Sequence, residues 1–418
     1  KNNFIAGCNA GLGVTLSNVV CNNILIGNCA GSSIDTQCNV VAIGACAASC
    51  LSESVGQSLF VGQEAGRFLG RTGCGNYGNV FLGNQAGKNL VGGCSNVAVG
   101  YLAGRGCDGC VLGNNNINMG WRTGENIKGG SNNMSFGRLS GSALSTGSNN
   151  VFMGNVAGTK MISGGCNIAI GYVALHDDCT GTNNIIMGNY AAACATAISD
   201  NVFLGRNAGR CGTGAYHNVG IGINVLRFTS TGKRNVAIGR CSGMYMTTGT
   251  DNIFFGSSAG FNNTCGKNNL IFGNSAGMAN TTGNYNIFLG LAAGMGNTVA
   301  SHSIAIGSYA GRCNKNSHSI SIGCRSSHHA CRNDSNDNIA IGRRAHEGLS
   351  GKMDGISCRN VAVGTYAGFY HTAGKTNVTL GFDAGKHNRG GDDNISIGRG
   401  TNCTLCVGGQ NISMGVNA

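Results

Sequence analysis

The chain contains no proline, and only 11% of its 418 residues are charged. Collagen is excluded, because its triple helix needs glycine at every third position and is rich in proline. Intrinsic disorder is excluded as well, because disordered chains combine low hydrophobicity with high net charge, whereas 41% of this chain is hydrophobic. Aromatic residues are scarce, at 6%. Any core must therefore be thin.

Long apolar runs are also missing. The longest, from Tyr190 to Ala195, is far shorter than the ~20 residues that a membrane-spanning helix needs. We expect no membrane span.

Glycine, by contrast, is abundant, with 74 residues, and it marks a repeat. The unit is Asn, apolar, variable, apolar, Gly, two variable residues and often Ala-Gly, as in Asn79-Val-Phe-Leu-Gly83 and Asn201-Val-Phe-Leu-Gly205. We call the glycine that closes the apolar triplet the marker. Between Gly120 and Gly307 the markers recur with a constant 17-residue spacing, and 24 markers occur between Gly7 and Gly415.

This repeat unit is too short for helix-pair repeats. Its apolar residues lie three and one positions before the marker, which predicts a short strand that buries these two residues. The position between them is then expected to face outward; it holds Phe81, Ala98, Phe203, Ala237 and Ser321. Glycine-rich segments between the strands supply turns. One unit therefore makes one coil.

The predicted fold class is all-β: a parallel β-solenoid, or β-roll, of about 24 short coils with a 17-residue repeat. Parallel strands about 4.8 Å apart would make a rod about 115 Å long. No shift in composition divides the chain, so we expect one continuous solenoid domain over 1–418. Its core is regular over 120–307, and its coils are irregular over 1–119 and 308–380.

Asparagine precedes the strand in many units, for example at Asn96, Asn167, Asn235 and Asn286. Stacked asparagines can hydrogen-bond amide to amide along such a rod. We interpret this column as structural.

The strand cores Asn96-Val-Ala-Val-Gly100, Asn235-Val-Ala-Ile-Gly239, Ser303-Ile-Ala-Ile-Gly307 and Asn338-Ile-Ala-Ile-Gly342 resemble the repeats of trimeric autotransporter adhesin heads. The longer unit, with Ala-Gly after the marker, is also similar to repeats of phage and algal-virus tail fibres. The resemblance implies a trimeric, left-handed parallel β-roll that binds host matrix or other surfaces. Independently, each coil offers few apolar positions against the ordering entropy of its residues, so a core shared by three chains would help.

The chain has 22 cysteines, which is too many for a reducing cytosol unless they bind metal. Three pairs are separated by one full repeat and occupy equivalent coil positions, where adjacent coils bring Cα atoms within the range of a disulfide. The predicted disulfides are Cys21 with Cys38, Cys29 with Cys46, and Cys194 with Cys211. The CxxC pairs at Cys107 and Cys403 are too far apart along the rod to share one metal, so no metal or other cofactor is predicted.

Two segments, Gly256-Ser-Ser-Ala-Gly260 and Gly273-Asn-Ser-Ala-Gly277, match the nucleophile elbow of serine hydrolases. The repeat itself generates this match, because sister units carry Gln85 or Asn207 at the middle position. The sixteen acidic residues form no repeating pair for general acid–base chemistry. We therefore predict no catalytic residues and no enzymatic activity.

The net charge is +12, and several arginines directly follow a marker, which predicts basic rows along the rod. These are Arg138, Arg206, Arg240, Arg343 and Arg399. Such rows either keep a weakly charged rod soluble or attract acidic glycans or a cell surface. Nucleic acid is not expected, because one tryptophan and ten tyrosines make no stacking platform. Among the Asn-X-Ser/Thr sequons, the candidate glycosylation sites are Asn262, Asn280 and Asn333.

Together these features favour an extracellular structural fibre or shaft, secreted or displayed on a cell or virion. We expect it to self-associate as a trimer or a fibre. An adhesive role is consistent with this interpretation. The alternative is a monomeric solenoid binding module for glycans or ice. Ice binding calls for a flat face of ordered threonines, which the predicted outward strand positions do not provide.

Overall fold

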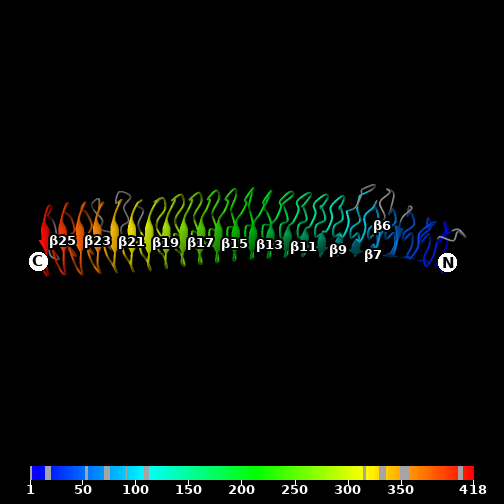
Figure 1. The fold of residues 1–418 in the computed structure, drawn as a ribbon, viewed down its shortest axis with the longest axis horizontal. Helices are drawn as coiled ribbons and strands as arrows, with labels where there is room; N and C mark the ends of the chain where they lie inside the picture. Colours follow the sequence, from blue (N-terminus) through cyan, green and yellow to red (C-terminus); the bar gives the residue numbers. More distant parts are fainter. Residues whose placement is uncertain are drawn as a thin grey trace. The chain divides into compact units, whose positions relative to one another are not determined.

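The structure, a computed structural model, describes residues 2–14, 20–51, 55–69, 76–90, 92–107, 113–313, 317–328, 336–348, 357–402 and 408–418. Within these ranges the regular elements are β-strands, and no helix occurs. The chain divides into two compact units, Lys1–Gly214 (unit 1) and Ala215–Ala418 (unit 2). In each unit the strands lie side by side, with the turns of each coil on the other side (Figure 1).

The strands are short, mostly of three residues. In unit 1 they are β1 (Phe4–Ala6), β2 (Ile24–Ile26), β3 (Val40–Ile43), β4 (Val55–Gly56), β5 (Ser58–Val61), β6 (Asn76–Tyr77), β7 (Val80–Leu82), β8 (Val97–Val99), β9 (Ile117–Met119), β10 (Met134–Phe136), β11 (Val151–Met153), β12 (Ile168–Ile170), β13 (Ile185–Met187) and β14 (Val202–Leu204). In unit 2 they are β15 (Val219–Ile221), β16 (Val236–Ile238), β17 (Ile253–Phe255), β18 (Leu270–Phe272), β19 (Ile287–Leu289), β20 (Ile304–Ile306), β21 (Ile320–Ile322), β22 (Ile339–Ile341), β23 (Val361–Val363), β24 (Val378–Leu380), β25 (Ile395–Ile397) and β26 (Ile412–Met414).

Consecutive coils pair in parallel and in register. In unit 1, Val151 of β11 faces Ile168 of β12, and in unit 2, Ile253 of β17 faces Leu270 of β18, in each case the equivalent residue of the next repeat. The register is also kept where a coil is longer: β22 aligns with β23, although equivalent residues are 22 positions apart in the sequence. A small additional pairing joins β4 to β6. The predicted all-β parallel β-solenoid with 17-residue spacing is confirmed.

The marker glycines are required by the close stacking of the coils. Gly171 has φ of 139°, which L-residues with a side chain rarely adopt, and a Cβ there would lie 2.5 Å from the carbonyl oxygen of Gly188, the next marker. A side chain at the marker would therefore force adjacent coils apart.

The prediction of which strand residues face inward is wrong. The middle residue of each triplet points inward, and Phe81, Phe203 and Ala237 are fully buried there. Ala98 and Ser321 are 1% exposed. The flanking residues, such as Val202 and Leu204, lie on the outside. A two-residue period separates two faces of a strand but does not tell which face is inside.

The asparagine column forms the predicted ladder. The Asn133 Oδ1 accepts hydrogen bonds from the Asn150 backbone N–H at 3.0 Å and from the Asn150 Nδ2 at 3.1 Å. The same Nδ2 also donates to the Gly164 carbonyl oxygen at 2.9 Å. Asn235 and Asn252 repeat the arrangement in unit 2. These buried amides are satisfied along the stack, and they hold each strand in register with the next.

Candidate functional site

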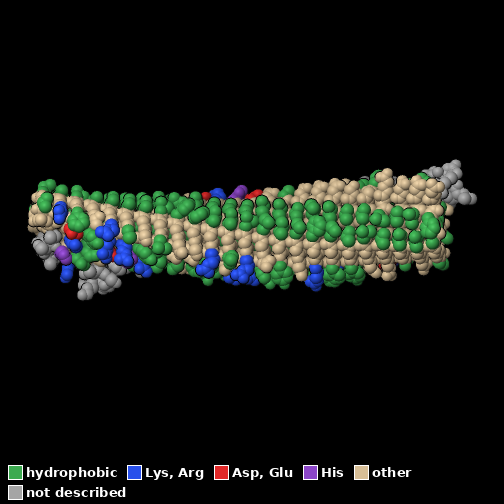
Figure 2. Space-filling view, turned by 90° about the horizontal axis from the view of Figure 1, so that it is seen from below, with side chains coloured by type: hydrophobic (Ala, Val, Ile, Leu, Met, Phe, Trp, Pro, Cys, Tyr) green, Lys and Arg blue, Asp and Glu red, His purple; other side chains and the backbone are tan. Residues whose placement is uncertain are grey.

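The outward faces of the strands form the most prominent surface of both units. We call the residues three and one positions before each marker the outer face. In unit 1 it runs from Phe4 and Ala6 on β1 to Val202 and Leu204 on β14, and in unit 2 from Val219 and Ile221 on β15 to Ile412 and Met414 on β26. Every residue at these positions is Ala, Val, Ile, Leu, Met or Phe. Figure 2 shows them as two adjacent rows of hydrophobic side chains along each unit.

The side chains of the outer face are partly exposed. Ile185 and Met187 are 39% and 41% exposed in unit 1, and Ile253 and Phe255 are 42% and 48% exposed in unit 2. If each side chain exposes about 50 Å², one unit exposes on the order of 1,000 Å² of contiguous apolar surface. A soluble monomer rarely exposes a contiguous apolar patch of more than a few hundred Å². Such a patch marks an interaction surface.

The outer face is also regular, because the strands are in register. Phe255 and Phe272 stack across adjacent strands with ring centroids 5.2 Å apart and an interplanar angle of 13°. A row of marker glycines forms one edge of the face, and the buried asparagine ladder forms the other. The surface therefore repeats once per coil, carries no charge of its own, and offers few groups that would give a small ligand polar specificity.

The predicted disulfides are not formed in the structure. Cys21 and Cys38 do lie on adjacent coils, since the Cys21 backbone N–H points at the Cys38 Sγ at 3.1 Å, but neither these two nor the other four cysteines are disulfide-bonded. The other four are Cys29, Cys46, Cys194 and Cys211. The reason is geometric: equivalent side chains on in-register coils point the same way about 4.8 Å apart, whereas a disulfide needs converging Cβ atoms about 3.8 Å apart.

The five arginines of the predicted basic rows share one coil position and are exposed. They do not form continuous rows, because uncharged residues such as Asn155, Tyr172 and Asn189 occupy the same position on coils between Arg138 and Arg206. The Arg138 guanidinium lies instead over the Trp121 ring, 4.9 Å from its centroid. In unit 2, Arg240 stands apart from Arg343 and Arg399, which belong to the C-terminal coils.

The glycosylation candidates have different surroundings. Asn280 is fully buried, its Nδ2 donates to the Gly283 carbonyl oxygen at 3.2 Å, and its Oδ1 accepts from the Gly283 N–H at 2.9 Å. The folded coil therefore leaves no room for a glycan there, which argues against this candidate. Asn262 is partly exposed and stays a prediction. Asn333 lies outside the described residues.

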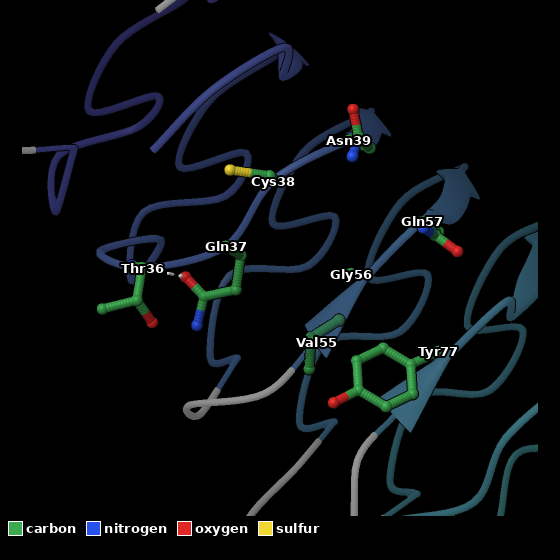
Figure 3. Close-up of a pocket in the computed structure, with 8 residues that line it drawn as sticks. All are labelled: Thr36, Gln37, Cys38, Asn39, Val55, Gly56, Gln57 and Tyr77. Carbon is green, nitrogen blue, oxygen red and sulfur yellow. Dashed lines mark hydrogen bonds between the residues drawn. The ribbon is translucent and has the colours of Figure 1, made fainter. Parts of the chain in front are cut away.

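One open pocket of about 260 Å³ lies in unit 1, beside the pairing of β4 with β6 (Figure 3). Its lining residues are Thr36, Gln37, Cys38, Asn39, Val55, Gly56, Gln57 and Tyr77. The Gln37 Oε1 accepts hydrogen bonds from the backbone N–H groups of Asp35 and Thr36 at 2.9 and 3.1 Å. Burial raises the pKa of the Cys38 thiol, which makes it a poor nucleophile. The lining offers no carboxylate or imidazole for acid–base chemistry.

The two elbow-like motifs lie on turns of the coil. Ser258 and Ser275 have φ of 57° and 55° and lie three residues after the ends of β17 and β18, but no helix comes after them in the described chain. The Ser275 hydroxyl donates to the Asn274 Oδ1 at 2.9 Å. Among the residues that the structure describes, no three His, Cys, Asp or Glu side chains come together as a metal site, and no helix is long and apolar enough to span a membrane.

The sequence pattern predicted that the residues of the outer face are buried inside the coil, so this apolar surface was not predicted. The signal was present, because the two apolar rows flank a third row that holds Phe and Ala, which are residues that can equally well fill the interior. Comparison with known proteins adds no further assignment: no family model matches the chain, and no curated protein matches it.

Proposed function

We propose that this protein is a structural shaft that assembles from identical chains through the outer face, and that three copies share one core. The observation that carries the proposal is the unbroken apolar outer face of each unit. A partner must be apolar over the same length and repeat with the same spacing, and a second copy of this chain meets both conditions. Each unit contributes about as much area as one partner of a stable interface, on the order of 800 Å².

Three copies rather than two are proposed, because each coil has few apolar positions of its own and a core shared by three chains adds to them. The resemblance of the strand cores to trimeric adhesin heads favours the same number. We further propose an extracellular or surface-displayed location, which the 22 cysteines support. In this proposal the protein is not an enzyme.

The test is the oligomeric state of the full chain at about 10 μM, by analytical ultracentrifugation. Wild-type protein should sediment as a trimer. A variant with Ile221→Glu, Ile253→Glu, Phe255→Glu and Phe272→Glu, all at exposed positions of the outer face and several coils away from the C-terminal coils, should be monomeric with an unchanged circular dichroism spectrum. Burying its carboxylates at an interface would cost several kcal/mol each.

A matched control carries the same number of new charges away from the outer face: Thr231→Glu, Thr248→Glu, Thr282→Glu and Val299→Glu, at exposed turn positions of the same unit. It should remain trimeric. A wild-type monomer would refute the assembly and favour the monomeric binding module, for which a thermal-hysteresis assay and a glycan screen then discriminate ice from sugar. A wild-type dimer would refute only the number of copies.

A further inference from the structure

The C-terminal coils of unit 2 combine cations and aromatic rings in one place. Tyr366 is at the centre, with the Arg343 guanidinium carbon 5.1 Å, the Arg344 guanidinium carbon 5.5 Å and the Lys386 Nζ 5.2 Å from its ring centroid. Phe382 meets the same ring edge-on at 6.4 Å. Near the C-terminal end of unit 2, Figure 2 shows Lys and Arg side chains gathered beside hydrophobic ones, apart from the rows of the outer face.

Along this cluster runs a column of four residues, each directly after a marker: Arg343, Thr365, Phe382 and Arg399. The column is held by the coil backbone, because Tyr366, Asp383 and Gly400 donate their N–H groups to the carbonyl oxygens of Arg343, Thr365 and Phe382. Phe382 is 49% exposed, and both arginines are exposed. At about 4.8 Å per coil, the two arginines lie about 14 Å apart with the phenyl ring between them.

The charge of the cluster is only partly compensated. Arg344 pairs with Glu347, and Lys386 pairs with Asp383 at 3.1 Å. In the part of the chain that the structure describes, neither Arg343 nor Arg399 pairs with a carboxylate. Two guanidinium groups therefore face solvent, and guanidinium groups bind carboxylates and sulfates with paired hydrogen bonds.

We propose that the column formed by Arg343, Phe382 and Arg399, with Tyr366 beside it, binds a linear acidic polysaccharide that runs along the coil axis. The acid groups of the polymer meet the two arginines, and the apolar face of the sugar between them packs on the Phe382 ring. The alternation of cation, ring and cation suits a polymer in which acidic groups are separated by sugar rings. Nucleic acid fits less well, because successive bases need several exposed stacking faces, and Phe382 supplies one.

This proposal adds a ligand to the proposed shaft, but the column lies within one chain. Binding therefore does not require the trimer, and the two proposals fail separately. The monomeric outer-face variant described above should bind the polysaccharide with unchanged intrinsic affinity per chain.

The experiment measures binding of the full chain to polygalacturonate by isothermal titration calorimetry at several salt concentrations, with neutral dextran and a 30-nucleotide oligothymidylate as comparison ligands. Wild-type protein should bind polygalacturonate with salt-sensitive affinity, and it should bind dextran and oligothymidylate at least tenfold more weakly. The double variant R343Q/R399Q should lose about tenfold in affinity and much of the salt dependence. Phe382→Ser should lose about fivefold and keep the salt dependence.

R206Q/R240Q is the matched control, because it also removes two exposed arginines that directly follow a marker, outside the column. It should leave the affinity unchanged. Equal losses in R206Q/R240Q and R343Q/R399Q would show attraction by net charge alone and overturn the site. Tighter binding of oligothymidylate than of polygalacturonate would overturn the ligand class. Circular dichroism and sedimentation of each variant confirm that fold and assembly are intact.

Discussion

The two units fill the same position of the coil differently. Seven residues after the marker, where the chain returns toward the strand, unit 1 buries apolar side chains such as Leu144 and Met161. Unit 2 keeps an apolar residue there at Met246, but it also buries amides such as Asn280 and Asn297, which are at most 1% exposed. We call this the return position.

Two of these buried amides are satisfied by their own turns. The Asn280 side chain bonds both the N–H and the carbonyl of Gly283, and the Asn297 Oδ1 accepts from the Ala300 N–H at 3.0 Å. Asp178, at the return position of an earlier coil, accepts four backbone N–H groups. Burial nevertheless raises the pKa of its carboxyl. The stacked backbone therefore defines the coil, and the return position accepts apolar side chains as well as buried amides, some of which are satisfied by their own turn.

The largest effect should come from placing an amide in the apolar column of unit 1. Leu144→Asn removes a fully buried leucine, so we expect a loss of about 3–5 kcal/mol. Urea unfolding, with hydrogen exchange to locate the affected coils, measures it. Leu144→Met is the control and should cost less than about 1.5 kcal/mol, because the next coil carries Met161 at this position. If Leu144→Asn costs no more than Leu144→Met, the two units do not differ in the way described.

The repeat was readable from the sequence because glycine and asparagine are tied to backbone requirements that recur in every coil. Gly171 is fixed by its positive φ and by the carbonyl of the next coil, and Asn150 by the ladder. The direction of the strand faces was not readable from periodicity. The predicted disulfides are not formed, because equal spacing along the sequence gives the cysteine side chains equal orientations in space. The outer face was not predicted as a surface, because apolar residues were assumed to lie inside.

One further rule could have been found in the sequence. A Cβ at Gly209 would lie 2.3 Å from the Phe203 ring, and one at Gly158 would lie 2.6 Å from the Phe152 ring. Four residues after the marker, glycine therefore accompanies a buried phenylalanine. Where the inward strand residue is small, the position can hold a larger side chain, as Leu175 does beside Ala169, although Gly104 and Gly243 accompany Ala98 and Ala237. The association therefore holds in one direction only: an inward phenylalanine is accompanied by glycine.

The second expected effect is a loss of stability between pH 7 and pH 5 that is larger in unit 2 than in unit 1. Burial, together with the nearby His371, lowers the pKa of His346 to about 3, and burial lowers the pKa of His371. Both imidazoles are therefore neutral in the fold, whereas the unfolded chain binds protons below about pH 6.5. Their stabilisation is complete above that pH and falls as the pH decreases toward 3. At pH 5 the loss from His346 should be about 2 kcal/mol.

Hydrogen exchange at pH 7 and pH 5 tests this comparison, because unit 1 contains only one histidine, the half-buried His176. His346→Leu is the matched variant: its coil has Ala340 as the inward residue, as the coil of Leu175 has Ala169. It should reduce the pH dependence of unit 2. An unchanged pH dependence in His346→Leu, or equal acid sensitivity of both units, would contradict the assignment.

The smallest expected effect separates two asparagines of the return position. Asn280 is hydrogen-bonded to Gly283, whereas in the part of the chain that the structure describes neither the Nδ2 nor the Oδ1 of the buried Asn263 has a hydrogen-bond partner. Removing Asn280 leaves the N–H of Gly283 unpaired, so Asn280→Ala should cost about 1–2 kcal/mol more than Asn263→Ala in urea unfolding. Equal costs would mean that side-chain volume, and not the local hydrogen bonds, is what lets unit 2 use amides where unit 1 uses leucine, isoleucine and methionine.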